Sequence, residues 1–178
     1  MATQLNGARI AFLATDGVEQ AELDQPWAAI SDSGGQPELI SLSGGKIQAF
    51  NHLDHGDTRS VDRDLDAANP DDYAALVLPG GVANGDFVRA DERAVSFVKS
   101  FFTSGKPVGV ICHGGWVLIE AGVVEGRTLT SWPSLQTDFR NAGAEWVDRE
   151  VVVDGKLVTS RKPDDLPAFS AAVLEQLA

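Results

Sequence analysis

The stretch VGVICHGGWVLI, residues 108–119, joins a β-branched apolar run to a second apolar run through Cys112, His113 and two glycines. This order predicts a buried strand, a sharp turn and the start of a helix, the unit from which parallel α/β sheets are built. Cys112 is the only cysteine and falls at the turn, so its sulfur should emerge at the end of a sheet. The unpaired N–H groups at the start of a helix favour a thiolate there, and serine hydrolases place their nucleophile in the same kind of elbow. We therefore expect a reactive thiol, the alternative being a small buried apolar residue.

The rest of the chain alternates strand-like apolar runs with segments of helical spacing. Strands are expected at 8–14, 38–43, 46–51, 73–78 and 108–111, a hairpin at 151–159, and helices at 19–33, 91–104, 116–121 and 165–177. The Asp154-Gly155 pair predicts the tight turn of the hairpin. Residues 52–72 are rich in Asp and Arg and lack periodicity, so they are expected to form a loop with at most one short strand. This alternation predicts one α/β domain over residues 1–178, with a mostly parallel sheet covered by helices on both faces.

Composition excludes several classes of protein. The chain has 178 residues, 43% of them hydrophobic, and a formal net charge of −12, with a pI near 4.5. Such acidity argues against nucleic acid or an anionic membrane as a partner. A single cysteine cannot form an internal disulfide, and no apolar run is long enough for a signal peptide or a membrane span. We expect a cytoplasmic protein.

Glycines and acids follow other predicted strands at the same edge of the sheet as Cys112. Gly80 and Gly81 end the run at 73–78, and their lack of side chains allows a ligand to approach the backbone. In parallel sheets, ligands bind at the carboxyl ends of the strands. The N–H groups of Gly81 and His113 could together hold an oxyanion there.

Glu19 and Glu22 lie one helical turn apart and should face the same side, as on many solvated helices. Beside a thiolate, one carboxyl should be protonated, because like charges disfavour joint ionisation. A protonated Glu22 could donate a hydrogen bond to the sulfur of Cys112 and exchange a proton with substrate.

Histidines are few and suggest acid–base chemistry more than metal binding. His113 follows the cysteine directly and could act as a general base, although neighbours at a sharp turn need not face each other. His52 and His55 lie in the predicted loop with no cysteine nearby, so we expect surface residues and no metal. No glycine-rich nucleotide motif follows the first strand, so no cofactor is expected.

Nearly the whole chain resembles the ThiJ/PfpI superfamily, in particular its PfpI-type intracellular protease/deglycase branch. The matching motifs are EQAEL (19–23), LPGG (78–81), GKP (105–107), ICHG (111–114), AGVV (121–124), NAGAEW (141–146), VVVDG (151–155), TSR (159–161) and PDDL (163–166). The resemblance implies a flavodoxin-like three-layer α/β sandwich of the class I glutamine amidotransferase type. It also implies a homo-oligomer, either a dimer or a larger ring.

The resemblance also implies roles for particular residues. Cys112 would be the nucleophile, Glu22 the acid bonded to its sulfur, and His113 its partner. In the protease branch a neighbouring subunit supplies a third acid after the Pro-Gly-Gly turn, and here Asp86 matches that position if one residue is inserted in the loop. The substrate-binding residues would be Glu19, Gly80, Gly81 and Gly114.

The function expected from these residues and this resemblance is that of a stress-response cysteine hydrolase. Its substrates would be reactive dicarbonyls such as methylglyoxal, or the early adducts that they leave on proteins. Two alternatives stay open: an intracellular cysteine protease with the same residues, and a redox sensor or chaperone without turnover, since an exposed thiolate is also readily oxidised. A glutamine amidotransferase subunit is less favoured, because no histidine occurs after His113.

Overall fold

A seven-stranded sheet forms the centre of the computed structural model, which describes residues 4–178. The strand order is β11-β12-β8-β7-β1-β3-β6, and all neighbours are parallel except β11 and β12. These strands are β1 (Arg9–Leu13), β3 (Gln36–Ser41), β6 (Arg63–Asp64), β7 (Ala75–Leu78), β8 (Val108–Ile111), β11 (Val151–Asp154) and β12 (Leu157–Ser160). The predicted, mostly parallel sheet is therefore confirmed.

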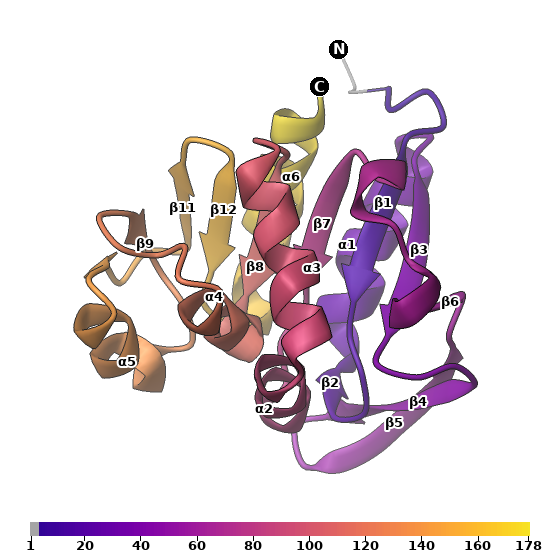
Figure 1. Ribbon diagram of the computed structural model, residues 1–178, viewed down its shortest axis with the longest axis horizontal. Helices are drawn as coiled ribbons and strands as arrows, with labels where there is room; N and C mark the ends of the chain where they lie inside the picture. The colour runs from indigo at the N-terminus through magenta and orange to yellow at the C-terminus, as the bar shows by residue number, and fades with distance from the viewer. Residues whose placement is uncertain (1–3) are drawn as a thin grey trace.

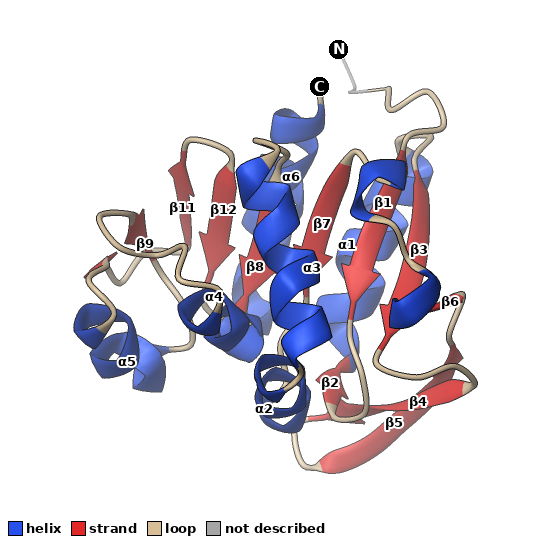
Figure 2. Cartoon of the chain, in the orientation of Figure 1, coloured by secondary structure: helices blue, strands red, loops and turns tan. Residues whose placement is uncertain are grey.

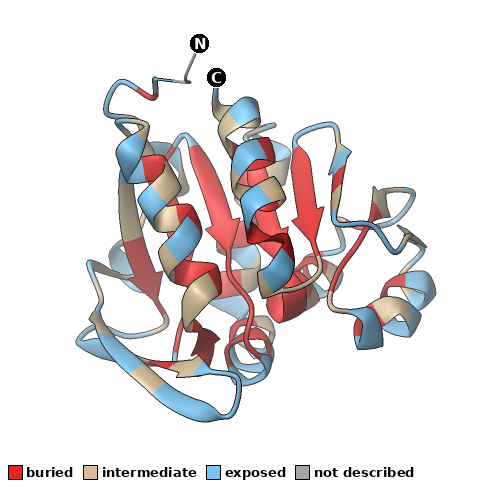
Figure 3. Cartoon of the chain, turned by 180° about the vertical axis from the view of Figure 1, so that it is seen from behind, coloured by how far each residue is buried: buried red, intermediate tan, exposed pale blue. Residues whose placement is uncertain are grey.

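Helices cover both faces of this sheet (Figures 1 and 2). One face carries α2 (Val82–Ala90), α3 (Glu92–Thr103) and α4 (Trp116–Glu120). The other carries α1 (Gln20–Asp32) and α6 (Leu166–Leu177), which are in front when the molecule is seen from behind (Figure 3). Three layers result, as the flavodoxin-like prediction requires. Within residues 4–178, no helix has the length and apolar character needed to cross a membrane.

Smaller elements surround the main sheet. A three-stranded sheet has the order β2-β4-β5, and a two-stranded sheet pairs β9 with β10. Their bounds, with those of α5 and the short 3-10 helices, are β2 (Val18–Glu19), β4 (Lys46–Asn51), β5 (Asp54–Ser60), β9 (Thr128–Leu129), β10 (Glu145–Trp146), α5 (Gln136–Asn141), η1 (Leu65–Ala67), η2 (Pro70–Asp72), η3 (Cys112–Gly115), η4 (Pro133–Leu135) and η5 (Pro163–Asp165).

Strand β1 shows why the sheet needs helices on both sides. Its side chains alternate between two apolar cores: Ile10 and Phe12 enter the core beneath α1 and α6, while Ala11 and Leu13 enter the core beneath α3. All four residues are buried. A continuous apolar run with period-two alternation is the pattern of a strand covered on both faces.

Three expectations are corrected by the structure. Residues 54–60, expected within a loop, form the seven-residue strand β5, which pairs with β4. Its side chains are mostly exposed, so the pairing comes from backbone hydrogen bonds and leaves no apolar pattern in the sequence. Helix α2 was not expected, and the hairpin turn lies at 155–156, with a positive φ at Gly155 only.

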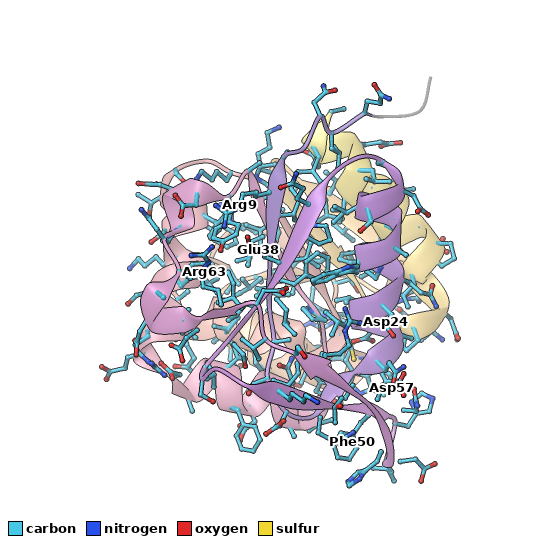
Figure 4. All side chains as sticks on the ribbon, turned by 90° about the vertical axis from the view of Figure 1, so that its right-hand side faces the viewer. Arg9, Asp24, Glu38, Phe50, Asp57 and Arg63 are labelled. Carbon is cyan, nitrogen blue, oxygen red and sulfur yellow. The ribbon has the colours of Figure 1, made fainter. Side chains whose placement is uncertain are left out.

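A polar network fixes β3 to its neighbours on the side away from α1. Arg9, Glu38 and Arg63 lie side by side in Figure 4. Glu38 accepts hydrogen bonds from Arg9 Nε (3.1 Å) and Nη2 (2.7 Å), from Tyr73 Oη (2.7 Å) and from Arg63 Nε (3.4 Å). Partial burial works to raise the pKa of Glu38, but the hydrogen bonds from Tyr73 and Arg9 outweigh it and hold the pKa below its ordinary value.

Candidate active site

A cavity of about 440 Å³ opens at the carboxyl ends of the central strands, beside Cys112. Five of the residues singled out from the sequence line it, namely Glu19, Glu22, Gly81, Cys112 and His113. The other lining residues are Gly17, Phe50, His52, Leu53, Val82, Ala83, Trp132 and Pro163. The structure thus brings together segments from both halves of the chain around the only thiol.

The backbone at Cys112 forms the predicted elbow. Strand β8 ends at Ile111, and Cys112 adopts a φ of +60° at the start of η3. This left-handed conformation is unfavourable for a residue with a side chain and is found mostly at turns and functional sites. Gly114 does not line the cavity: a Cβ there would lie 2.5 Å from the carbonyl oxygen of Leu78, so its role is to let the elbow pack against the end of β7.

Glu22 points from the first turn of α1 to the back of this elbow and is completely buried. Its Oε2 accepts a hydrogen bond from the N–H of Gly80 at 2.8 Å, while Oε1 has no hydrogen-bond partner in the described chain. Gly80 separates the acid from the cysteine so narrowly that a Cβ would lie 2.3 Å from Oε2 and 2.6 Å from the Cβ of Cys112. The carboxyl of Glu22 and the side chain of Cys112 therefore both pack against Gly80, at a position where no residue with a side chain would fit.

The acid of this pair is held in its protonated form. Burial raises the pKa of Glu22 to about 8, and the charge of Glu19 acts in the same direction, against the lowering effect of the adjacent thiol of Cys112 and of the hydrogen bond from Gly80. The sequence-based expectation of a protonated carboxyl beside the sulfur agrees with this shift.

The expectation of a lowered pKa at Cys112 is wrong, because the sequence did not reveal how deeply the thiol is buried. Only 6% of the residue is exposed. Burial raises the pKa of the thiol, and the charge of Glu22 raises it further, while the N–H groups of His113 and Gly81 lower it by hydrogen bonding to the sulfur. The charge repulsion between Glu22 and a thiolate at Cys112 disappears when Glu22 is protonated. A negative charge on sulfur is then stabilised by the protonated carboxyl and by the two N–H groups, although burial still opposes it.

His113 faces the thiol, an arrangement that could not be assumed from the sequence. Its Nδ1 lies 3.2 Å from Sγ of Cys112. Burial lowers the pKa of His113 to about 4, so the imidazole is neutral at neutral pH and can accept a proton but does not form an ion pair with the sulfur. No carboxylate hydrogen-bonds to this imidazole within residues 4–178.

Two tryptophans hold the imidazole from both sides. Trp132 stacks on His113 at 5.5 Å with a ring angle of 27°, and Trp116 meets it edge-on at 5.1 Å. Trp116 is in turn fixed by a hydrogen bond from its Nε1 to Asp138 (3.0 Å) and by the guanidinium of Arg89, 5.4 Å from its ring centre. Sequence reasoning missed both contacts, because neither a tryptophan in an apolar run nor one in a polar loop gives a sign of what it packs against.

Glu19 lies before the helix, in β2, rather than on it. Its carboxylate nevertheless lines the same cavity as Glu22 and accepts the backbone N–H of His52 at 3.1 Å (Oε2) and 3.4 Å (Oε1). Its own N–H donates to the carbonyl oxygen of Gly80 at 3.2 Å. Pairing between β2 and β4 therefore brings Phe50 and His52 to the mouth of the cavity.

Asn84 is a further residue that the sequence did not reveal. It is buried in α2, where its Oδ1 accepts the N–H of Thr15 at 2.8 Å and its Nδ2 donates to the carbonyl oxygens of Pro79 and Gly80, both at 3.0 Å. One side chain thus ties the loop after β1, which leads into β2 and α1 with the two acids, to the turn after β7, which contains Gly80 and Gly81.

Asp86 lies on α2 as well, but away from the cavity. It is exposed and belongs to a shallow groove with Arg89, Glu92 and Glu120. Within one chain it does not join Cys112 and His113.

Comparisons with known proteins support one family. The profile of the DJ-1/PfpI family matches residues 8–176. A protein named "Deglycase TK1284" from Thermococcus kodakarensis is 46% identical over 90% of this chain and 94% of its own. "Protein/nucleic acid deglycase 2" from Escherichia coli is 42% identical over 95% and 97%. Among solved structures, a two-domain protein from Anabaena variabilis with DJ-1/ThiJ/PfpI-like and ferritin-like domains superimposes with a TM-score of 0.90 and 31% identity, covering 96% of this chain and 48% of that one.

Proposed function

Because the chain belongs to the DJ-1/PfpI family, we propose that it is a cysteine-dependent deglycase of the stress-response type, acting on reactive dicarbonyls and on their early adducts with proteins. The family resemblance inferred from the sequence is confirmed. Relatives that share 42–46% of their residues with this chain over nearly their full length carry the name deglycase. A single cysteine, unable to form an internal disulfide, suits the reducing cytoplasm, where we place this activity.

One observation carries the proposal: the only thiol lines a cavity of small-molecule size, with Glu22 on one side and His113 on the other. An acid that keeps its proton at neutral pH and a neutral imidazole form an acid–base pair at one reacting atom. Dicarbonyl conversion requires both functions at successive steps.

The first step is attack by sulfur on the carbonyl carbon. The sulfur of Cys112 forms a bond to the aldehyde carbon of methylglyoxal while the π electrons move to the oxygen. The N–H groups of Gly81 and His113, which lie against the sulfur, are close enough to bind the oxyanion on the adjacent carbon. Glu22 gives its proton to that oxygen and takes up the proton that the thiol of Cys112 releases, so a hemithioacetal results and Glu22 is again protonated. On a protein adduct, sulfur instead displaces the modified amine or thiol, which leaves with the proton.

The second step moves hydrogen between the two carbons. Neutral His113 removes the proton from the carbon that bears sulfur and returns it to the neighbouring carbonyl carbon. The hydroxyl proton passes through Glu22 to the oxygen of that second carbon, and the hemithioacetal becomes a thioester. Water then cleaves the thioester and releases lactate and the thiol. One carbon is oxidised and the other reduced by the same amount, so no external oxidant is needed.

Asp86 is proposed to serve the site of a neighbouring chain rather than its own. Its exposure on α2, next to the exposed side chains of Val82 and Phe87, supports this assignment. Mixing Cys112→Ser chains with Asp86→Asn chains tests it, because mixed oligomers would contain intact sites made from two chains. We expect activity to return on mixing; full activity of Asp86→Asn alone would contradict the assignment.

A second candidate function, peptide cleavage, is favoured by the 3.2 Å contact between Cys112 and His113, since cysteine proteases use such a pair. Assaying the purified protein on unmodified peptides and on methylglyoxal, under the same conditions, separates the two. We expect lactate formation and no peptide cleavage above that of the Cys112→Ala variant.

The decisive experiment for the proposed function is substitution of the thiol. Cys112→Ser should reduce lactate formation from methylglyoxal at least about 10³-fold, because a serine hydroxyl without a strong base is a far weaker nucleophile. The melting temperature should change little, since the two side chains differ by one atom. A serine variant with the activity of the parent protein would refute the proposal.

A further inference from the structure

The cavity beside Cys112 contains acids but no permanent cation. Its lining includes two glutamates and two histidines, and neither lysine nor arginine occurs among the described residues that line it. An anionic substrate would therefore meet no ion-pair partner there. The imbalance between acidic and basic side chains suggests that the cavity distinguishes substrates by their charge.

Glu19 supplies the charge of the cavity. Its side chain is only 12% exposed, and within residues 4–178 the carboxylate accepts hydrogen bonds only from the backbone N–H of His52. Within residues 4–178, the basic side chain found within 4.0 Å of this carboxylate is that of His52, with Nδ1 3.7 Å from Oε1. Because 82% of the His52 side chain is exposed, solvent screens its interaction with Glu19. A carboxylate that is removed from water without a cation is electrostatically uncompensated, and a bound cation would stabilise it.

Two further features make the cavity receptive to a cation. Oε1 of Glu22 is buried, has no hydrogen-bond partner in the described chain and belongs to the same lining. It gives the cavity a second oxygen acceptor whether the acid is charged or not. The rings of Phe50 and Trp132 form part of the wall, and aromatic faces attract cations.

We propose that this cavity selects carbonyl compounds that carry a positive charge beside the reacting carbon and rejects those that carry a carboxylate, with Glu19 as the residue that determines the preference. The inference rests on the proposed function and narrows its substrate class. Among protein adducts of dicarbonyls, those on arginine or lysine side chains fit the site better than those beside acidic groups. Small 2-oxo acids are poor ligands.

Coulomb's law gives the size of the effect. Two unit charges about 6 Å apart, at an effective dielectric constant of about 40, change an equilibrium or rate constant about tenfold. Attraction of a cation and repulsion of an anion act in opposite directions, so the two classes should differ about a hundredfold.

The single cysteine allows a test that needs no turnover. Methanethiosulfonate reagents whose ethyl arm ends in a trimethylammonium group or in a sulfonate form a disulfide with Cys112 and release methanesulfinate. The ratio of their two rate constants, divided by the same ratio for a free thiol, measures charge selection by the cavity. Both reagents react with the same thiolate, so the pKa of Cys112 cancels from the ratio.

We expect the corrected ratio to favour the cationic reagent about a hundredfold in the parent protein and to fall about tenfold or more in Glu19→Gln. Glu19→Asp, which keeps the charge, should retain most of the preference. Glu125→Gln is the matched control: it removes the same charge from an exposed position outside the cavity and should leave the ratio unchanged. A ratio near one in the parent protein, or an equal ratio in Glu19→Gln, overturns the inference.

Lactate formation from uncharged methylglyoxal, measured on the same samples, separates this inference from the proposed function. A protein that shows the charge ratio but produces no lactate refutes the function and keeps the selectivity of the cavity. If the protein produces lactate but Cys112 reacts with both reagents at the same corrected rate, only the charge selectivity is refuted.

Discussion

Two glutamates of this chain, Glu22 and Glu38, occupy opposite kinds of environment. Glu38 receives four hydrogen bonds from two arginines and a tyrosine, and its pKa lies below the ordinary value. Glu22 receives one hydrogen bond from a backbone N–H, has one unpaired oxygen, and its pKa is raised to about 8. Glu38 thus has donors for both carboxylate oxygens, whereas Glu22 has a donor for only one.

The difference in environment distinguishes a glutamate that stabilises the fold from one that can transfer a proton. An ionised acid surrounded by fixed donors holds strands together and has no reason to exchange its proton. A buried acid with a free oxygen next to a thiol is costly for folding, and such a cost persists where the proton is used. The comparison therefore supports the proposed role of Glu22 in proton transfer and indicates that Glu38 serves stability.

Of the changes that test this comparison, substitution of Glu22 should have the largest effect on activity. Glu22→Gln keeps the size and can still accept the N–H of Gly80, but it has no acidic proton to transfer. General acid–base groups contribute about 10²–10⁴-fold, so we expect lactate formation to fall by that factor. The free energy of unfolding should stay equal or increase, since a strained acid has been removed. An active Glu22→Gln protein would abolish the distinction between the two glutamates.

The dependence of stability on pH should be the next largest effect. Between pH 4.5 and 8 the folded chain keeps a proton on Glu22 that the unfolded chain has released, so the free energy of unfolding falls as the pH rises. His113, with a pKa lowered from 6.5 to about 4, acts in the opposite sense below pH 6.5. The loss should therefore be clearest from pH 6.5 to 8, at about 1.4 kcal/mol per pH unit.

Chemical denaturation at a series of pH values measures this slope. In Glu22→Gln the slope from pH 6.5 to 8 should flatten. Glu38 predicts the reverse behaviour: because its pKa is lowered, its contribution to stability is lost as the pH falls below the ordinary carboxyl range. Equal pH profiles for Glu22→Gln and the parent protein would show that Glu22 is not protonated in the folded state.

Exposure of His113 should have an intermediate effect. Trp132→Ala removes the stacked ring, which lets water reach the imidazole and should raise its pKa from about 4 towards the ordinary value. We expect lactate formation to fall by up to about fourfold at pH 6, where most of the imidazole would be protonated if its pKa returned to 6.5 and could no longer act as a base. Trp132→Phe keeps a stacked ring and serves as the control. NMR titration of the imidazole should show the shift in the first variant only.

Substitution of Glu38 should have the smallest effect, and on stability alone. Glu38→Gln loses the charge that accepts hydrogen bonds from Arg9, Arg63 and Tyr73, and hydrogen bonds to charged groups contribute about 1.5–3 kcal/mol each when buried. Because these side chains are partly exposed, we expect a loss of about 1–2 kcal/mol in the free energy of unfolding. Lactate formation should stay within about twofold. A large loss of activity in the folded variant would mean that the network also shapes the site.

Features of the molecule that depend on residues close together in the chain could be predicted from the sequence. The protonation of Glu22 was expected from a neighbouring negative charge, whereas burial is its largest cause in the structure. The elbow at Cys112 and the strands that end beside it follow from apolar runs and glycines. They could be predicted because each depends on residues close in sequence or on the common edge of a parallel sheet.

Features that depend on distant packing could not be predicted. The raised pKa of Cys112 comes from burial by several segments, and the contact of Trp132 with His113 joins residues that no periodicity links. Strand β5 carries polar side chains on an edge, where backbone pairing with β4 leaves no pattern to read. The roles of Phe50 and Asn84 likewise appear only once the loops around the cavity are placed.

The protonation of Glu22 can be measured directly by a carbon-13 NMR titration of the glutamate carboxyls, with Glu38 as the internal reference in the same spectra. The account predicts that the Glu22 signal titrates near pH 8, while Glu38 titrates below the ordinary glutamate value of 4.5. Two signals that both titrate near 4.5 would contradict it, because the thiol would then face a permanent negative charge instead of a proton donor.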